Sequence, residues 1–306
     1  MKILLLGADG QVGGYLRRTL ASVGDVRASS RATTDEALRC DLSDAAAVGN
    51  FLRDERPDLV VNAAAYTAVD HAEHDVDAAM RINATLPGVI GSTVAGWGGA
   101  VIHYSTDYVF DGTANRPYTE DDATAPLGVY GHSKLAGEQA LAASGVEHLV
   151  LRTAWVYSLR GRNFLTTMLR LARERGPLSV VDDQRGTPTS AGYLADITAR
   201  IAADWLADTR SRGEKNGIFH LTATGDTTWY GFAKAIFDEA VAAGKLPHAP
   251  TVLPIASASY PTPAQRPAYS ILDTSRLIAS FGVMPPQWRD DLRMVMSGDY
   301  DALSSD

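Results

Sequence analysis

The stretch KILLLGADGQVG at residues 2–13 decides the fold, because an apolar run passes directly into three glycines spaced G-x-x-G-x-x-G. Its first five residues predict a short buried strand, and the residues from Gln11 onward predict a helix. At such a junction Gly7 allows a tight turn, Gly10 lets the backbone approach a pyrophosphate, and Gly13 allows close packing of the helix on the strand. The first N–H groups of the helix then face the anion. A plain turn is the alternative, but the position at the first strand–helix junction favours dinucleotide binding.

Short apolar runs and helical patterns alternate through the first half of the chain. Strands that are apolar throughout are typical of a parallel sheet buried on both faces. A repeated strand–helix–strand order then predicts a right-handed doubly wound sheet. The fold class is therefore α/β, a Rossmann-type parallel sheet with a smaller C-terminal substrate-binding domain. The expected strands are 2–6, 25–29, 59–62, 100–104 and 148–152, and the expected helices are 11–23, 71–95, 130–143, 164–175, 192–208 and 229–243.

The pattern changes after about residue 155, where turns and prolines become frequent. We predict an NAD(P)-binding Rossmann domain at residues 1–155, with returning segments near 191–225. Residues 156–190 and 226–306 are predicted to form the substrate-binding domain, whose proline-rich stretch is irregular.

The charge and composition of the 306 residues exclude several classes of protein. The net charge is −8, with acidic and basic residues interspersed, which argues against nucleic acid as the main partner. No run approaches the roughly 20 apolar residues of a membrane span, and no secretory signal is evident. Cys40 is the only cysteine, so no intrachain disulfide can form. We therefore expect a cytoplasmic protein that binds neither nucleic acid nor a membrane.

The end of the second predicted strand bears on the choice of cofactor. NAD-selective sites usually carry an acidic residue there for the ribose 2′-hydroxyl, whereas this chain has Ser30 and Arg31. A hydroxyl and a guanidinium suit a 2′-phosphate, so the sequence favours NADPH, with NADH as the alternative. Further cofactor contacts are expected where a predicted third strand and the strand at 59–62 end, at Asp41, Leu42, Ala63, Ala64 and Ala65.

The segment Tyr130-Gly131-His132-Ser133-Lys134 opens a predicted helix, and the i, i+4 spacing puts Tyr130 and Lys134 on one face. A nearby ammonium lowers the pKa of a phenol. Tyr130 is therefore predicted to donate a proton to a carbonyl oxygen as a hydride reaches its carbon. Lys134 is also expected to bind the nicotinamide ribose. A bare Y-x-x-x-K pattern is most often a solvated helix face, but its place behind a dinucleotide-binding turn favours catalysis.

Ser105-Thr106-Asp107-Tyr108 follows the strand predicted at 100–104, which places its polar groups at the same edge of the sheet. Thr106 is predicted to hydrogen-bond the substrate carbonyl and polarise it. Removal of water from a sugar would need a further acid and base, such as a Glu, where this chain has Tyr108. The segment therefore favours simple reduction.

Two further signals receive a structural interpretation. His71 and His74 are spaced i, i+3 on a predicted helix. The acidic residues around them are explained by the helix dipole, so no metal site is expected. Trp229 and Tyr230 are expected to anchor a helix in the core.

Taken together, these motifs resemble the dTDP-4-dehydrorhamnose reductases, a family of the extended short-chain dehydrogenase/reductase group. The likeness runs almost end to end, and its later segments distinguish this family from other sugar-nucleotide enzymes. The matching segments are GADGQVG at 7–13, NAAAYTAVDHAE at 62–73, HYSTDYVFDG at 103–112, VYGHSKLAGE at 129–138, RTAWVYS at 152–158, NFLTTMLRLARE at 163–174, VVDDQRGTPT at 180–189, TTWYGFA at 227–233 and YPTPAQRPAYSIL at 260–272.

The resemblance implies NAD(P)H-dependent reduction of the C4 keto group of dTDP-4-dehydro-β-L-rhamnose to dTDP-L-rhamnose. By position, it implies that Tyr130 is the proton donor and that Lys134 is its partner. It adds Gln11, Val12, Tyr66 and Thr67 to the expected cofactor contacts. The substrate contacts that it implies are Thr106, Asp107, Trp155, Asn163, Gln184, Thr187 and Arg266.

One departure from the family concerns a metal ion. Tyr15 stands where some relatives carry a Glu linked to a magnesium ion at a dimer interface, so Mg²⁺ is not expected and a homodimer is left open. Two other functions also stay open. One is a related sugar-nucleotide epimerase–reductase, which product stereochemistry would reveal, and the other is a non-catalytic NADP-binding regulatory subunit. The presence of Thr106, Tyr130 and Lys134 together favours catalysis.

Overall fold

The computed structural model describes the chain except residues 31–32, 34, 175, 208–211 and 303–306. Its centre is a parallel sheet with the strands β1 (Lys2–Leu6), β2 (Asp25–Ser29), β3 (Leu59–Asn62), β4 (Ala100–Thr106), β5 (Glu147–Thr153) and β10 (Gly217–His220). The strand order is β10-β5-β4-β3-β1-β2. The predicted α/β fold with a Rossmann-type sheet is confirmed. Because the order reverses between β1 and β3, the carboxyl ends of these strands flank a crevice suited to a ligand.

Helices cover both faces of the sheet, which explains why its strands are apolar throughout. They include α1 (Gln11–Thr19), α2 (Ala45–Glu55), α5 (Leu86–Val94), α6 (Val129–Ala143) and α8 (Ala191–Ala207). On one face α1 packs against α8, and on the other α2 and α6 each pack against α5. Side chains alternate along β1, so that Ile3 and Leu5 enter one core while Leu4 and Leu6 enter the other.

The single helix expected at 71–95 is wrong, because this segment is broken. It consists of α3 (Val69–Ala72), α4 (Val76–Met80), a π-helical turn at Arg81–Thr85, and α5. A π turn accommodates one residue more than an α turn. The hydrophobic pattern alone did not reveal this extra residue.

The π turn places Asn83 in a buried position, where its side-chain amide is fully used. Asn83 Oδ1 accepts from Tyr66 N at 2.8 Å, while Nδ2 donates to Tyr66 O and to Ser133 Oγ, both at 3.0 Å. Asn83 therefore ties the loop after β3 to α6.

Two strand predictions also change. The third strand expected before Asp41 is wrong, since the described residues between β2 and α2 contain a 3₁₀ turn at Glu36–Leu38 and no strand. In contrast, β4 and β5 run past their expected ends, to Thr106 and Thr153, which lie opposite each other in the parallel register. Both hydroxyls are therefore at the carboxyl edge of the sheet.

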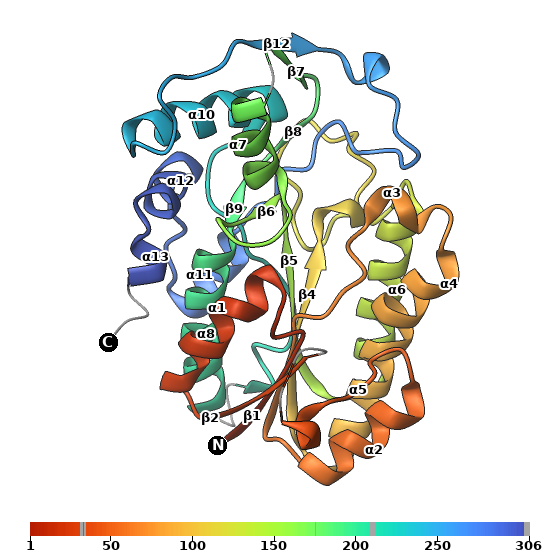
Figure 1. Cartoon of the computed structure of the whole chain (residues 1–306). Helices are drawn as coiled ribbons and strands as arrows, with labels where there is room; N and C mark the ends of the chain where they lie inside the picture. Colours follow the sequence, from red (N-terminus) through yellow and green to blue (C-terminus); the bar gives the residue numbers. More distant parts are fainter. Residues whose placement is uncertain (31–32, 34, 175, 208–211, 303–306) are drawn as a thin grey trace.

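Smaller elements extend the molecule beyond that edge, as Figure 1 shows. They are β6 (Val156–Tyr157), α7 (Phe164–Glu174), β7 (Leu178–Val181), β8 (Arg185–Gly186), β9 (Thr189–Ser190), β11 (Thr227–Thr228), α10 (Trp229–Ala242) and β12 (Val252–Ile255). Three later helices complete the chain, namely α11 (Ser275–Phe281), which packs against β10, α12 (Trp288–Ser297) and α13 (Asp299–Ala302). The short strands pair as β6 with β9, β7 with β12 and β8 with β11. Within the described residues, every helix is too short or too polar to span a bilayer.

A buried ion pair joins α6 to β5. The Arg152 guanidinium donates through Nε and Nη2 to the two carboxylate oxygens of Glu138, at 2.9 and 2.6 Å. Both side chains are only 2% exposed. The guanidinium also lies over the Phe110 ring, 5.2 Å from its centroid. Because either charge alone would be costly at this depth, the pair fixes the register of the helix against the strand.

Replacing Glu138 with Ala should lower the free energy of unfolding by about 3–5 kcal/mol, because the Arg152 charge would stay buried without its partner. Urea denaturation followed by circular dichroism measures this change. The matched control is Glu174→Ala, which breaks the exposed Arg170–Glu174 pair on α7 and should cost less than about 1 kcal/mol. Equal losses in the two variants would contradict the assigned role of the buried pair.

Candidate active site

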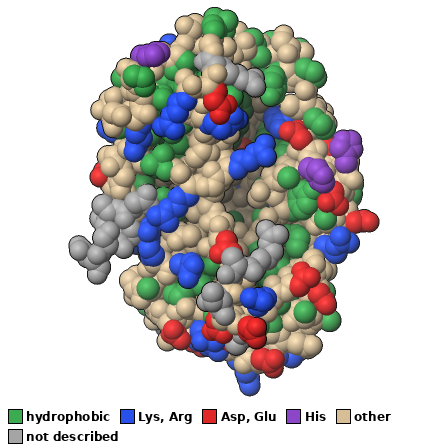
Figure 2. All heavy atoms as spheres, in the orientation of Figure 1, with side chains coloured by type: hydrophobic (Ala, Val, Ile, Leu, Met, Phe, Trp, Pro, Cys, Tyr) green, Lys and Arg blue, Asp and Glu red, His purple; other side chains and the backbone are tan. Residues whose placement is uncertain are grey.

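A cavity of about 1170 Å³ opens at the carboxyl edge of the sheet. Figure 2 shows the molecule hollowed between the sheet and the smaller elements. The volume exceeds the roughly 300–1,000 Å³ of sites that hold one drug-sized ligand. The cavity therefore has room for a cofactor beside a substrate.

The glycine-rich turn after β1 forms one side of this cavity. Gly7 has a left-handed backbone with a φ of 80°, and a Cβ on Gly13 would lie 2.1 Å from the Gly7 carbonyl oxygen. Helix α1 begins at Gln11, with Gly10 as an N-cap that has no side chain. The first N–H groups of α1 are therefore accessible to an anion, and the turn fits the diphosphate of a dinucleotide.

The other residues expected at the cofactor fall into two groups. Gly10, Gln11, Val12, Ala63, Ala65, Thr67, Tyr130 and Lys134 line the cavity. Outside its lining lie Gly7, Gly13, Ser30, Asp41, Leu42, Ala64 and Tyr66. Among these, Asp41 Oδ1 accepts from Ser43 N at 2.9 Å, and Leu42 packs against a core cluster. Arg31 is outside the described residues.

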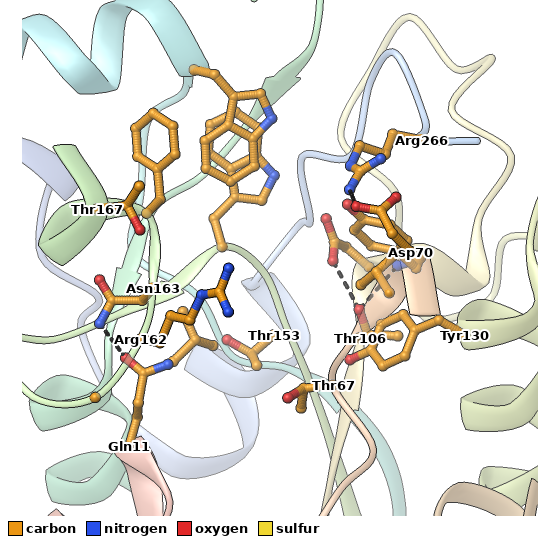
Figure 3. Close-up of a pocket in the computed structure, with 18 of the residues that line it drawn as sticks. Gln11, Thr67, Asp70, Thr106, Tyr130, Thr153, Arg162, Asn163, Thr167 and Arg266 are labelled. Atoms are coloured by element: carbon orange, nitrogen blue, oxygen red, sulfur yellow. Dashed lines mark hydrogen bonds and ion pairs between the residues drawn. The ribbon is translucent and has the colours of Figure 1, made fainter. Parts of the chain in front are cut away.

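Tyr130 lies at the start of α6 and faces Thr106 at the end of β4 (Figure 3). Burial raises the pKa of the Tyr130 phenol to about 12, while the neighbouring Thr106 hydroxyl lowers it and the charge of Asp107 raises it. The expectation that an ammonium makes this phenol acidic is therefore not met. Tyr130 instead carries its proton throughout the neutral range.

Lys134 lies one helical turn further along α6 and is held by β4. Its Nζ donates to the Tyr104 carbonyl at 2.5 Å and lies 3.3 Å from His103 Nε2. Burial lowers the pKa of the Lys134 ammonium to about 8, and the charge of Glu138 raises it. The ammonium is therefore the major form at pH 7, by a modest margin.

Thr106 and Asp107 form a hydrogen-bonded unit beside Tyr130 (Figure 3). Thr106 Oγ1 donates to Asp107 Oδ1 at 3.0 Å and accepts from Tyr108 N at 3.2 Å. Burial raises the pKa of the Asp107 carboxyl to about 6, and hydrogen bonds from Ser270 and Thr106 lower it. Asp107 is therefore ionised at neutral pH but protonates within a mildly acidic range.

A second wall of the cavity is aromatic. The Trp155 and Trp229 rings stack with centroids 3.5 Å apart and planes 5° apart, and the Phe164 ring is tilted against Trp229 at 4.7 Å. The prediction that Trp229 and Tyr230 anchor a helix is confirmed, since both pack against the core at the start of α10, but Trp229 also lines the cavity, which was not predicted. Trp155 has a left-handed backbone, which costs an L-residue on the order of 1–2 kcal/mol.

Arg266 reaches the cavity from the segment after β12 (Figure 3). It donates through Nη2 to Asp70 Oδ2 at 2.8 Å and through Nη1 to Thr262 Oγ1 at 2.5 Å. The hydrogen bond from Arg266 lowers the pKa of the Asp70 carboxyl. The Arg266 guanidinium is therefore ion-paired and also lines the cavity, where it was expected as a substrate contact.

The remaining substrate candidates differ in their surroundings. Asn163 Nδ2 donates to Gln11 Oε1 at 2.7 Å, which links the start of α7 to the start of α1 (Figure 3). Gln184 lines the cavity. Thr187 is 1% exposed and lies outside the lining, with Oγ1 donating to the Gly225 carbonyl at 2.8 Å.

Several lining residues escaped prediction from the sequence. Thr153 could have been found, because it ends a strand as Thr106 does and lies opposite it in the register. Loop residues such as Arg162 carry no comparable signal. The lining residues that no prediction named include Asp9, Asp70, Tyr104, Thr153, Arg162, Phe164, Thr167, Met168, Tyr260 and Thr262.

Comparison with known proteins places this geometry in a family. The model described as RmlD substrate binding domain matches residues 1–300. The dTDP-4-dehydrorhamnose reductase of Burkholderia thailandensis is 46% identical over 291 residues, covering 94% of this chain and 96% of the relative. The chain belongs to the dTDP-4-dehydrorhamnose reductase family. The enzyme of that name from Salmonella typhimurium is 44% identical over 297 residues, covering 97% of both chains.

Solved structures of family members share the fold. The dTDP-4-dehydrorhamnose reductase of Clostridium acetobutylicum has a TM-score of 0.85 at 34% identity and covers 99% of both chains. That of Bacillus anthracis, in complex with NADP, has a TM-score of 0.85 at 31% identity and covers 96% of this chain and 98% of its own. The resemblance seen in the motifs is therefore confirmed for the family.

Replacing Thr153 with Val should raise the free energy of unfolding of the ligand-free protein by about 1 kcal/mol or more. Thr153 Oγ1 is buried without a hydrogen-bond partner among the described residues, and removing an unsatisfied hydroxyl recovers its desolvation cost. Thr198→Val is the matched control, because Thr198 Oγ1 donates to Leu194 O at 2.7 Å and hydrogen-bonds Tyr104 Oη. Urea denaturation should show the control destabilised, and a destabilised Thr153→Val would refute the assignment of a free hydroxyl.

Proposed function

We propose that this chain catalyses the NAD(P)H-dependent reduction of the C4 keto group of dTDP-4-dehydro-β-L-rhamnose to dTDP-L-rhamnose. The observation that carries the proposal is the meeting of Tyr130 and Thr106 in the cavity that the glycine-rich turn also lines. Membership of the dTDP-4-dehydrorhamnose reductase family supports the substrate, and the NADP complex of the Bacillus anthracis enzyme supports the cofactor.

The residues of this chain fit a dinucleotide at one side of the cavity. Gly10, Gln11 and Val12 would hold the pyrophosphate at the start of α1, and Lys134 would hold the nicotinamide ribose. When bound, the reduced nicotinamide supplies the hydride. Ser30, in place of an acidic residue, favours NADPH, with NADH as the alternative.

Tyr130 is the proton donor in this proposal. Its buried phenol keeps its proton at neutral pH and releases it to the C4 oxygen as negative charge develops there. Thr106, whose single hydroxyl proton points to Asp107 in the structure, would turn that proton to the C4 oxygen and polarise the carbonyl. Lys134, fixed by the Tyr104 carbonyl, stabilises the phenolate that remains.

The sugar nucleotide occupies the rest of the cavity in this proposal. Arg266 suits the diphosphate, because a guanidinium donates in a two-pronged fork, although it must share its donors with Asp70. Thr187 is left out of the proposed set because it is buried outside the lining. The proposed substrate contacts are Thr106, Asp107, Trp155, Asn163, Gln184 and Arg266.

The same proposal assigns the two ligands to different segments of the chain. Residues 1–155 and 191–225 bind the cofactor, and residues 156–190 and 226–306 bind the sugar nucleotide. The single cysteine agrees with a cytoplasmic location. A homodimer and a monomer are both compatible with the sequence, and light scattering coupled to size-exclusion chromatography would decide between them.

Replacing Tyr130 with Phe should lower kcat about 10²- to 10⁴-fold, because the proton donor is lost while the ring remains. The measurement is the oxidation of NADPH in the presence of the dTDP-4-keto sugar. NADPH binding, followed by fluorescence, serves as the control and should be retained. Steady turnover by the wild type excludes a non-catalytic subunit, and a variant with nearly full activity would refute the role of Tyr130.

The pH dependence of kcat/KM should be bell-shaped. The rate should fall below about pH 6, because Asp107 gains a proton and loses its acceptor for a sugar hydroxyl. It should also fall above about pH 8, because Lys134 loses its charge. Asp107→Asn should remove the acidic limb and keep the basic one. An acidic limb that persists unchanged in this variant would assign it to another group.

A further inference from the structure

Trp155 leaves the end of β5 in a direction that an ordinary strand backbone would not give. Its φ is 46°, in the left-handed region that L-residues rarely adopt. Its carbonyl accepts from Thr189 N at 3.3 Å, and the next residue, Val156, pairs with Thr189. The backbone that follows the indole is therefore fixed against β9.

The indole is held in turn by the small ladder of β8 and β11. Thr227 pairs with Gly186 in this ladder, and Trp229 follows two residues later as the first residue of α10. Trp229 stacks on Trp155 with the planes 5° apart. A Cβ on Gly186 would lie 2.5 Å from Trp155 Cε2. The β8–β11 ladder therefore places two supports against the Trp155 indole, the Trp229 ring and the backbone of Gly186.

Trp229 itself is firmly placed. The preceding residue, Thr228, caps α10 by accepting from Gly231 N at 3.0 Å, and donates to Asp182 Oδ1 at 2.5 Å. The Phe164 ring lies 4.7 Å from the Trp229 ring. Trp229 can therefore act as a rigid support rather than as a side chain that follows Trp155.

We propose that Trp229 is a positioning residue which, together with Gly186, fixes the Trp155 indole at the distance that the sugar ring of the substrate requires. The identity of the ligand rests on the proposed function. A 6-deoxyhexose carries a methyl group and several C–H bonds, and such an apolar face suits an aromatic wall. Without Trp229, one face of Trp155 loses its support, and the indole is free to move away from the sugar.

The stack has its own spectroscopic signature. Two indoles in close parallel contact couple their electronic transitions and give an exciton couplet in the circular dichroism spectrum. The wild type should show this couplet, and both Trp229→Leu and Trp155→Phe should lose it. Trp97→Phe is the control, since Trp97 donates to the carbonyl of Pro57 at 2.9 Å, just before the amino end of β3 and opposite the carboxyl edge that borders the cavity. A couplet that persists unchanged in Trp229→Leu would overturn the proposal.

Kinetics tests the consequence for the substrate. In Trp229→Leu, kcat/KM for the dTDP-4-keto sugar should fall about 10- to 100-fold, as expected when a reacting group is displaced, while KM for NADPH stays unchanged. Trp229→Phe keeps an aromatic face and should recover part of the loss. A Trp229→Leu variant that melts as the wild type does, lacks the couplet and keeps its sugar KM and kcat would overturn the positioning role.

The proposed function and this inference fail in different ways. If the wild type gave no turnover, the proposed function would be lost. Calorimetric affinity for dTDP-L-rhamnose would then replace KM as the readout. An affinity about tenfold weaker in Trp229→Leu would support the positioning role, and an unchanged affinity, or none in the wild type, would overturn it.

Discussion

The two-pronged ion pair between Glu138 and Arg152 sets the geometry of the cavity. Glu138 lies on the helix that begins with Tyr130 and Lys134, and Arg152 lies on the strand that continues into Thr153 and Trp155. The pair is buried and satisfied at both carboxylate oxygens, so helix and strand cannot slide past each other without separating two charges in a medium of low polarity. The proton donor on one element and the aromatic wall on the other are thereby held in a fixed relation.

Much of the fold could be predicted from local pattern. A dozen residues specify strand β1, the glycine-rich turn and the start of α1. At position 13 only glycine fits, because α1 packs so closely there that a Cβ would collide with the Gly7 carbonyl oxygen. The Tyr130–Lys134 spacing likewise survives folding, since i, i+4 residues share a helix face whatever surrounds them. What the sequence could not supply was the acidity of Tyr130, which depends on burial by residues distant in the chain.

Features that depend on tertiary contacts were missed. A tryptophan at the start of a helix indicates packing against the core. The sequence did not show that Trp229 also stacks on Trp155, 74 positions earlier, and so lines the cavity. Thr187 sits in a family motif, yet its hydroxyl turns to the Gly225 carbonyl. Thr153 was hidden by a strand end placed one residue too early. In each case the residue type was informative, but the direction in which the side chain points depends on residues far away in sequence.

The π-helical turn at Arg81–Thr85 makes this region sensitive to the number of its residues rather than to their kind. Deleting a single residue would restore regular α-helix, because a π turn holds one residue more than an α turn, and the flanking helices would keep their faces. Asn83 would then leave its place between Tyr66 and Ser133, and the loop after β3 would lose its tie to α6. Related chains can therefore exchange side chains along this helix, but a deletion within the turn would have to be compensated by another contact between that loop and α6.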